Sequence, residues 1–415
     1  MPSLVFRRTA HNRNSLPPLI RALDKAGVSE HLHITFADGP GRTLETAQIA
    51  AYSLTTVDLA WALPEVVDLR NRQRRPWLVA GGAHPSADPQ GMLAAGFDVA
   101  FVGEGEESFP HFMREWLDAT AHGAAAQADL THQARPYPNP IRYASPTGID
   151  LNSLVHADAR RRLFPFAEIS RGCSYACGFC QVPHLFGRRM RHRSPAVVAE
   201  GVAQAVTAGH RRIRFLSPDA FAYRGDAKLP AAESVASLLS ACHAAGASQL
   251  MLGSFPSEVR PDHITVDLLR LIREGCINRT LVLGAQSGSD RVLGLMNRGH
   301  TVEKARRAIL LTVEARLVPH VDLLFCFPGE SAAERLQTIQ LARWCLEHNA
   351  RLHIHVYVPL PGTPAWPAPP ERFEPTIVQA LRRMESTGRM DGYWKKQRAQ
   401  GAQILKWRAE GKILV

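Results

Sequence analysis

The sequence predicts an α/β fold with two successive parallel sheets and a helical C-terminal region. Strand-like apolar runs alternate with amphipathic helical patterns over residues 1–120, and the same alternation resumes after residue 161. The stretch between them, residues 121–160, is rich in Ala, Gly and Pro, which is typical of an interdomain linker. We therefore expect domains over residues 1–120 and 161–365, joined by this linker, and a helical extension over residues 366–415.

The first domain is predicted to be a doubly wound parallel sheet. Its expected strands cover residues 4–6, 32–36, 47–53, 77–80 and 98–102. Ligands on such sheets bind at the carboxyl ends of the strands, where small residues let a ligand approach the backbone. The candidate ligand-binding residues at these ends are Ser53, Thr55, Gly81, Gly82, Gly103 and Glu104. Each of them taken alone is equally well explained as a turn residue.

The second domain is predicted to contain βα units, too few for a closed eight-stranded barrel. Its expected strands cover residues 166–169, 212–216, 249–255, 280–285, 320–326 and 352–358. Helical patterns separate them, so we expect parallel pairing and chemistry at the carboxyl ends of the strands. Two further helical patterns, rich in Arg and Lys, follow at residues 375–390 and 391–413, where Trp394 and Trp407 are expected to anchor the core.

Composition favours a soluble globular protein. The 415-residue chain is 45% hydrophobic, and its most apolar stretch, residues 238–255, is interrupted by polar side chains, so no membrane segment is expected. Three of the seven cysteines cluster and the others are scattered, which favours a reducing compartment, and we expect a cytoplasmic protein. The net charge of +11 is compatible with an anionic partner, but the arginine clusters are not interleaved with aromatic residues, so nucleic-acid binding is disfavoured.

Three cysteines on one short loop form the candidate metal site. Cys173, Cys177 and Cys180 follow a short apolar strand at CxxxCxxC spacing, and the next cysteine lies far downstream. Thiolates bind zinc or iron–sulfur centres, and a closed structural site needs a fourth ligand. Three thiolates on a 4Fe-4S cluster leave one iron open to a substrate or cofactor. The alternative is a zinc knuckle completed by a distant ligand such as His184 or His192.

This loop, with Phe179 before its last cysteine and a strand before its first, resembles that of the radical S-adenosylmethionine (SAM) superfamily. The resemblance implies that the three cysteines hold a 4Fe-4S cluster and that the open iron binds SAM, with Phe179 beside it. One electron from the reduced cluster then cleaves SAM to methionine and a 5′-deoxyadenosyl radical. It further implies an open six-stranded partial βα barrel over residues 161–365 and an electron donor such as flavodoxin or ferredoxin as a partner.

Motifs at the expected strand ends match the same superfamily in order. Asp219, in Ser-Pro-Asp-Ala, stands where the superfamily usually has Gly-Gly-Glu, whose carboxylate holds the SAM amino group. Gln286 and Ser287, in Gly-Ala-Gln-Ser-Gly-Ser-Asp, match a stretch that contacts SAM ribose and methionine. Arg298, in Met-Asn-Arg-Gly, matches a cation for the SAM carboxylate, and the alternative is a solvated arginine at a helix end. The match continues in Phe-Pro-Gly-Glu at 327–330 and Pro-Leu-Pro-Gly-Thr-Pro at 359–364.

The strand ends of the first domain are similar to those of the cobalamin-binding domain that precedes the barrel in one large radical SAM subfamily. The match is best over residues 79–106, where paired glycines are followed by Gly-Glu-Gly-Glu. It implies that the six candidate residues of that domain contact cobalamin. The sequence lacks the Asp-x-His-x-x-Gly motif whose histidine ligates cobalt in other cobalamin domains, so we expect cobalt without a protein histidine ligand.

These resemblances together predict a cobalamin-dependent radical SAM enzyme that methylates an unactivated carbon of a small-molecule or peptide substrate. Two alternatives stay open. Methylthiotransferases also carry Gln-Ser-Gly-Ser-Asp and a later Met-x-Arg-Gly, but that family has three more cysteines in its N-terminal domain, and none precedes Cys173 here. A non-catalytic cobalamin or iron–sulfur sensor would have little need for a complete set of SAM-contacting strand ends. No motif identifies a catalytic residue or the substrate.

Overall fold

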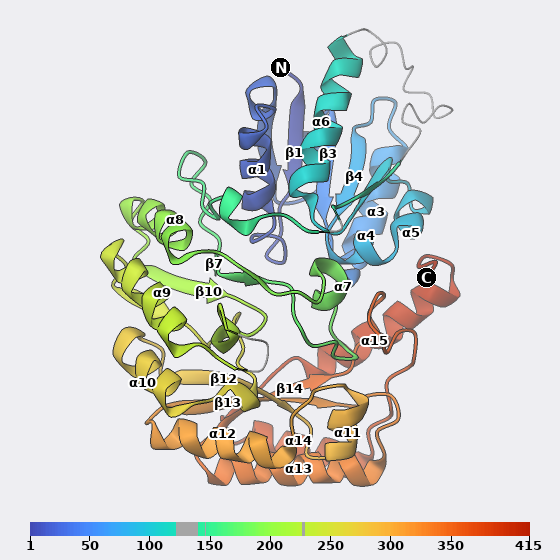
Figure 1. Ribbon diagram of the computed structural model, residues 1–415. Helices are drawn as coiled ribbons and strands as arrows, with labels where there is room; N and C mark the ends of the chain where they lie inside the picture. Colours follow the sequence, from blue (N-terminus) through green and yellow to red (C-terminus); the bar gives the residue numbers. More distant parts are fainter. Residues whose placement is uncertain (122–139, 146, 226–228) are drawn as a thin grey trace. The chain divides into compact units, whose positions relative to one another are not determined.

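The computed structural model describes residues 1–121, 140–145, 147–225 and 229–415 (Figure 1). The chain divides into two compact units: Met1–Pro165 with Lys406–Val415, and Phe166–Leu405. Residues 122–139 of the expected linker lie outside the described residues. Among the described helices, none combines the length and apolar character needed to cross a bilayer.

The first unit is built on a six-stranded, all-parallel sheet in the order β2-β1-β3-β4-β5-β6. The strands are β1 (Ser3–Arg7), β2 (His33–Ala37), β3 (Ile49–Ser53), β4 (Trp77–Gly81), β5 (Val99–Val102) and β6 (Ile141–Tyr143). The first five confirm the predicted doubly wound sheet, whereas β6 lies in the stretch expected as linker. Because β2 and β3 leave β1 on opposite sides, the carboxyl ends of β1 and β3 form a topological switch point, where such sheets bind ligands.

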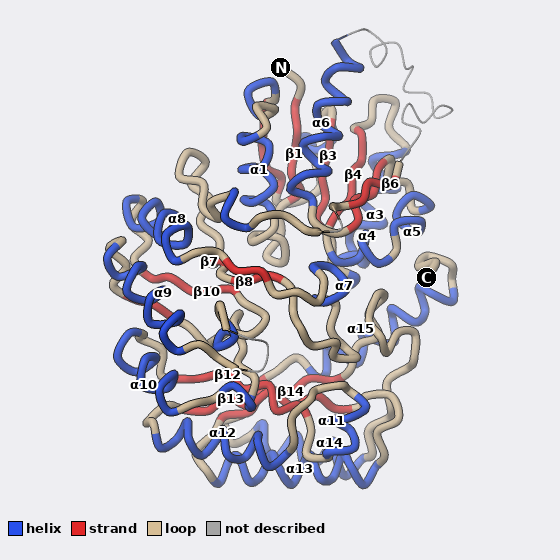
Figure 2. The backbone as a smooth tube through the Cα atoms, viewed as in Figure 1, coloured by secondary structure: helices blue, strands red, loops and turns tan. Residues whose placement is uncertain are grey.

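Helices cover both faces of this sheet (Figures 1 and 2). The helices are α1 (Leu16–Lys25), α2 (Arg42–Glu45), α3 (Leu59–Arg70), α4 (Ala83–Ala87), α5 (Pro89–Ala94) and α6 (Gly105–Ala121). One face presents Leu4, Phe6 and Phe101 to buried side chains of α1 and α6. On the other face, Tyr52 stacks on Trp61 of α3. Side chains of alternate strand residues thus serve opposite faces, as the period of two requires.

The second unit contains an open row of parallel strands. The strands are β7 (Ala167–Glu168), β10 (Arg212–Leu216), β11 (Gln249–Met251), β12 (Thr280–Gln286), β13 (Val318–Phe325), β14 (Arg351–Val356) and β15 (Met390–Asp391). Hydrogen bonds join them as β11-β10-β7 and as β12-β13-β14-β15. Single parallel bridges, Ser217 with Ser257 and Val259 with Leu283, connect the two sheets. The first six strands confirm the predicted partial βα barrel.

Helices of the second unit pack on one side of these strands. They are α8 (Pro195–Thr207), α9 (Ala232–Ala244), α10 (Val266–Gly275), α11 (Asp290–Leu295), α12 (Val302–Glu314) and α13 (Ala332–Glu347). In β13 and β14, fully buried apolar residues such as Leu323 and Ile354 alternate with polar residues such as Asp322 and His353. Because α12 and α13 contact these strands, the apolar set lies beneath the helices and the polar set faces the barrel interior.

Three local features of the second unit differ from the expectation. Strand β11 ends at Met251, four residues before the expected end, because the chain turns at Gly253 with a φ of +71°. An antiparallel pair, β8 (Ser170–Arg171) with β9 (Arg191–His192), brackets the cysteine loop and the short helix α7 (Val182–Phe186). Beyond residue 370, helices α14 (Pro375–Glu385) and α15 (Trp394–Ala409) correspond to the two predicted helical patterns, but β15 lies between them, where no strand was expected. Trp394 and Trp407 are buried there, as predicted.

Candidate active site

The cysteine loop is fixed at its base by backbone geometry. It leaves β8 through Gly172, whose φ is +83° and where a Cβ atom would lie 2.4 Å from the carbonyl oxygen of Arg189. Only glycine is compatible with both conditions. The backbone N–H of Cys173 then donates to the carbonyl of Gly187, at 3.2 Å, which closes the loop back toward β9.

Distant segments of the second unit hold the loop from the other side. Gly178 donates its N–H to Met296 and accepts a hydrogen bond from the N–H of Ala365, both at 2.9 Å. Asn297 donates to the carbonyl of Ala176 at 3.1 Å. These partners lie in or beside the Met-Asn-Arg-Gly and Pro-Leu-Pro-Gly-Thr-Pro motifs, so the fold brings the matched motifs to the cysteine loop.

The three thiols suit a metal cluster larger than a single zinc ion. Around one zinc, with Zn–S bonds of about 2.3 Å, sulfurs lie roughly 3.8 Å apart. In the part of the chain that the structure describes, the one group of potential ligands gathered within 4.8 Å does not include these cysteines. Nδ1 of His192 is hydrogen-bonded to Ser170, at 2.8 Å, so this nitrogen already has a partner. These observations disfavour the zinc knuckle.

Burial disfavours the thiolate forms of the loop cysteines unless a metal binds them. Burial raises the pKa of Cys180 to about 12. Burial likewise raises the pKa of the Cys173 thiol. Thiolates at these positions at neutral pH therefore require a bound metal.

Arg298 lies in the interior and is not a solvated arginine at a helix end. Its side chain is buried, and its Nη2 donates to the carbonyl of Gly284 at 2.7 Å. Its Nη1 lies 3.5 Å from the sulfur of Cys177, and its guanidinium lies 5.9 Å from the ring centroid of Phe179. The structure thus places Arg298 beside Cys177 and Phe179 of the cysteine loop.

Gly284 provides space for three functional side chains. A Cβ atom there would lie 2.8 Å from Nη2 of Arg298, 2.9 Å from Nε2 of Gln286 and 3.5 Å from Oε2 of Glu258. Gln286 itself has a φ of +67° at the end of β12, which turns the chain and directs the side chain back toward Gly284. Gln286 therefore belongs to the same cluster of side chains as Arg298.

Ser287 is placed differently from its neighbour. Its fully buried hydroxyl lies 3.3 Å from Oγ1 of Thr338 and accepts a hydrogen bond from the N–H of Ser289 at 3.1 Å. The side chain therefore ties the end of β12 to α13 and is not directed to the cluster loop.

Asp219 is buried and belongs to a polar chain that reaches the cysteine loop. Its Oδ2 lies 2.6 Å from Nδ1 of His263, and Nε2 of His263 lies 3.3 Å from the hydroxyl of Tyr175. Its Oδ1 makes no hydrogen bond with any residue that the structure describes. Burial alone would lower the pKa of His263, but the Asp219 carboxylate outweighs it and raises that pKa above its usual value. An unpaired buried carboxylate oxygen fits a cationic ligand such as an amino group.

Two carboxyl groups that the sequence interpretation missed face the same interior. Glu258 and Asp322 share a hydrogen bond, and burial raises the pKa of both groups, that of Asp322 well above its usual value. Burial and the mutual repulsion of the two carboxylates thus favour a state in which the pair shares a proton. The signal for Asp322 was present in the sequence: His320 and Asp322 are polar residues at alternate positions of an otherwise apolar strand.

In the first unit, the candidate residues lie at the carboxyl ends of β3, β4 and β5, but several side chains have local roles. Thr55 forms a reciprocal capping box with Asp58. The carboxylate of Glu104 accepts the N–H of Ile149 at 3.0 Å. Gly82 has a φ of +100°, and a Cβ atom there would lie 2.9 Å from the backbone of Leu54, so the turn itself requires glycine.

The remaining candidates at these strand ends are Ser53, Gly81 and Gly103. Gly81 and Gly103 are half-buried, and Ser53 shares a hydrogen bond of 2.9 Å with Ser15. The structure adds His11, which the sequence interpretation missed. This exposed histidine follows β1, and its Nδ1 lies 2.8 Å from the buried carboxylate of Asp58.

The second unit is similar to a known protein superfamily. The model of the radical SAM superfamily matches residues 167–342. A curated relative, tRNA-2-methylthio-N(6)-dimethylallyladenosine synthase from Chlorobium chlorochromatii, is 33% identical over 225 residues, which cover 52% of this chain and 46% of that protein. The chain thus spans about half the length of this relative.

Solved structures extend the likeness to both units. The radical SAM methyltransferase TsrM from Kitasatospora setae, with cobalamin and a [4Fe-4S] cluster bound, has a TM-score of 0.61 at 16% identity and covers 88% of this chain and 74% of its own. The cobalamin-dependent radical enzyme OxsB has a TM-score of 0.54 at 14% identity and covers 82% of this chain and 52% of its own. At these identities the likeness concerns the fold. Residues 167–342 therefore match the radical SAM superfamily, and the fold of the chain is similar to those of TsrM and OxsB.

Proposed function

We propose that the protein is a cobalamin-dependent radical SAM enzyme that transfers a methyl group to an unactivated carbon of a small-molecule or peptide substrate. One observation carries the proposal. A doubly wound sheet of the order 2-1-3-4-5, extended by β6, precedes a partial barrel whose cysteine loop is surrounded by buried charged groups. When bound, the cluster supplies one electron for SAM cleavage and cobalamin supplies the methyl group.

The residues of the second unit have separate roles in this proposal. The three cysteines hold the cluster, and the unpaired Oδ1 of Asp219 accepts the SAM amino group. Arg298 pairs with the SAM carboxylate, and Gln286 donates to its ribose or methionine part. Tyr175 and His263 position Asp219 through the contacts that link it to the cysteine loop. Ser287 has no direct role, because its hydroxyl is engaged with α13.

The Glu258–Asp322 pair is the candidate for substrate recognition. A protonated carboxyl donates a hydrogen bond, and its ionised partner accepts one, so the pair can hold a polar substrate group in the barrel interior. The raised pKa of each carboxyl favours retention of a proton by the pair. We assign the pair to binding alone.

The fit to cobalamin depends on the first unit. Support comes from the switch point between β1 and β3 and from the half-buried Gly81 and Gly103 at neighbouring strand ends. Thr55 and Glu104 would contribute backbone atoms, since their side chains have local partners. We propose that no histidine of the protein ligates the cobalt. His11, the exposed histidine after β1, is the residue to replace in a test of this proposal.

The decisive experiment uses SAM with a deuterated methyl group. Protein loaded with cluster and hydroxocobalamin is reduced in the presence of SAM and a metabolite or peptide extract, and products are analysed by mass spectrometry. Transfer of the labelled methyl group to carbon, in a reaction that requires cobalamin, is the expected result. Turnover of SAM that is unaffected by cobalamin and gives no methylated product would contradict the proposal.

A methylthiotransferase is the second candidate, because the curated relative that covers half of this chain carries that activity by name. Such an enzyme would add a methylthio group to an RNA base and contain additional iron. Iron and sulfide content, together with nucleoside analysis of RNA incubated with the protein, separates the two candidates. A sensor would form no 5′-deoxyadenosine under either condition.

A further inference from the structure

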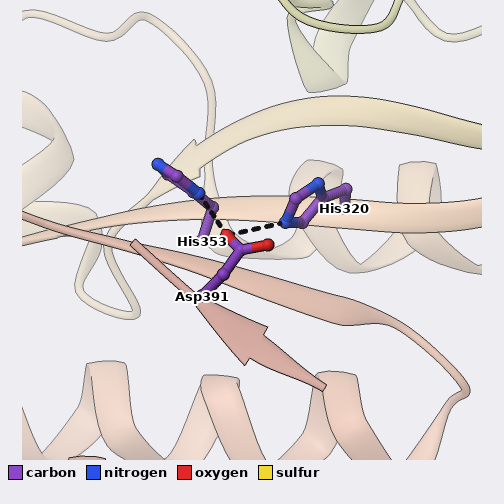
Figure 3. A group of neighbouring side chains, drawn as sticks. All are labelled: His320, His353 and Asp391. Atoms are coloured by element: carbon purple, nitrogen blue, oxygen red, sulfur yellow. Dashed lines mark hydrogen bonds and ion pairs between the residues drawn. The ribbon is translucent and has the colours of Figure 1, made fainter. Parts of the chain in front are cut away.

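Two histidines and a carboxylate meet on the interior face of the last strands of the partial barrel (Figure 3). His320 lies near the start of β13, His353 in the middle of β14 and Asp391 at the end of β15. The register pairs Asp322 with His353 and His353 with Asp391. Because paired and alternate residues share a face, the three side chains project from the same side of the sheet.

The separation of His320 and Asp391 matches that between two ligands of one metal ion, and His353 contacts the same carboxylate directly. Nε2 of His320 lies 3.3 Å from Oδ1 of Asp391, and Nδ1 of His353 contacts the same oxygen. All three ligand atoms lie within 4.8 Å of one another. A tetrahedral ion with bonds of about 2.0–2.1 Å separates its ligand atoms by roughly 3.3–3.4 Å. Rotation of His353 away from the carboxylate oxygen would let all three side chains bind one ion.

The surroundings leave one of these nitrogens without a hydrogen bond. Nε2 of His320 is buried and makes no hydrogen bond with the residues that the structure describes, although the carboxylate oxygen lies close by. A buried ring nitrogen without a partner is unfavourable unless something else satisfies it. An ion between the imidazole and the carboxylate would do so. The side chain of Asp391 is 48% exposed, which gives an ion access from solvent.

We propose that His320, His353 and Asp391 bind a single divalent transition-metal ion, separate from the cysteine loop. Two imidazoles and one carboxylate form a ligand set typical of zinc and non-haem iron(II), and they leave at least one coordination position open. The ion would link β13, β14 and β15. Because β15 has only two residues, it forms few hydrogen bonds with β14. It would also place an open coordination site on the interior face that carries Asp322.

The test uses zinc and the protein with its iron–sulfur cluster assembled, so that the cysteines are already occupied. After incubation with zinc and removal of unbound metal, the metal content is measured by mass spectrometry. We expect about one zinc per chain. X-ray absorption at the zinc edge should show nitrogen and oxygen neighbours at about 2.0–2.1 Å and no sulfur near 2.3 Å. Absence of zinc, or a sulfur shell, would overturn the proposal without any variant.

Variants assign the ion to the triad. His353→Gln and Asp391→Asn should each weaken zinc binding by at least about tenfold, since even changes one shell further out cost 10- to 100-fold. The matched control is His348→Gln, a half-buried histidine at the C-cap of α13 and outside the triad. Iron content and circular dichroism establish that each variant is folded and cluster-loaded. Stoichiometric zinc in both triad variants would show that the contact of His353 with Asp391 is only an ion pair.

Discussion

Replacement of Gly284 by alanine tests whether Arg298 is held in place for SAM. The added Cβ would lie 2.8 Å from Nη2 of Arg298, and comfortable contacts begin near 3.5 Å, so the guanidinium must move by about 0.5 Å or more. This movement stretches the 2.7 Å hydrogen bond to the Gly284 carbonyl, and complete loss of that bond sets the upper limit of the cost. A hydrogen bond from a charged donor contributes about 1.5–3 kcal/mol. Gly284 does not have a positive φ, so the alanine regains about 0.4–1 kcal/mol through the unfolded state.

The net cost to the free energy of unfolding is therefore about 1–2 kcal/mol, which lowers Tm by a few degrees in a domain of this size. The effect on SAM is larger in relative terms. If Arg298 pairs with the SAM carboxylate, losing an interaction of about 1.5–3 kcal/mol weakens SAM binding by roughly 10- to 150-fold. Equilibrium dialysis of labelled SAM and the rate of 5′-deoxyadenosine formation measure this on cluster-loaded protein.

Gly294→Ala is the matched control. Gly294 lies in α11, where a Cβ atom would meet nothing within 4 Å. This variant should bind SAM as the unmodified protein does and should gain up to about 1 kcal/mol of stability. Equal SAM affinity of Gly284→Ala and Gly294→Ala, at equal iron content, would refute the role assigned to Arg298.

Three further outcomes are expected. Replacing the three loop cysteines together by alanine should abolish both the iron signal and 5′-deoxyadenosine formation, and an iron signal that survives would refute the cluster assignment. Hydroxocobalamin should bind at micromolar concentration and, after mild reduction, give a paramagnetic spectrum without nitrogen splitting; splitting that disappears in His11→Ala would instead identify His11 as a cobalt ligand. His84 is fully buried, and burial lowers its pKa from 6.5 to about 4, so the unfolded state binds the proton first as pH falls. The corresponding stability of the first unit, about 3 kcal/mol, is present above pH 6.5 and lost between pH 6.5 and 4. Urea unfolding between pH 6.5 and 4 measures this loss of stability. The control His33→Gln, which replaces an exposed histidine, should keep the pH dependence. The same pH dependence in His84→Gln would contradict the assignment.

The two units illustrate what local patterns predict well. Five strands of the first sheet and six of the barrel follow from apolar runs and their spacing, because burial of a strand on both faces requires a continuous apolar sequence. The ends are less reliable. Strand β11 stops at Met251 because a turn at Gly253 replaces ladder pairing, and β15 forms only because β14 offers it an edge. Neither event depends on the residues of that segment alone.

The candidate sites show the same division. The cysteine loop could be recognised in the sequence because its three cysteines lie within a few residues of one another. Residues so close in the sequence stay close in the folded chain. Ser287 and Gln286 are neighbours in the sequence, yet one hydroxyl is buried against α13 and the other side chain turns toward Gly284. The positive φ of Gln286 decides this, and it is a property of the strand end in its tertiary setting.

The sequence alone determined the fold class, and it predicted the candidate cluster ligands and the binding of SAM and cobalamin. Only the tertiary structure placed His263 against Asp219, joined Glu258 to Asp322 and brought two histidines to Asp391. Those groups are separated by dozens of residues along the chain, so their meeting depends on strand order and register. A shift of one residue in that register would turn each side chain to the opposite face of the sheet.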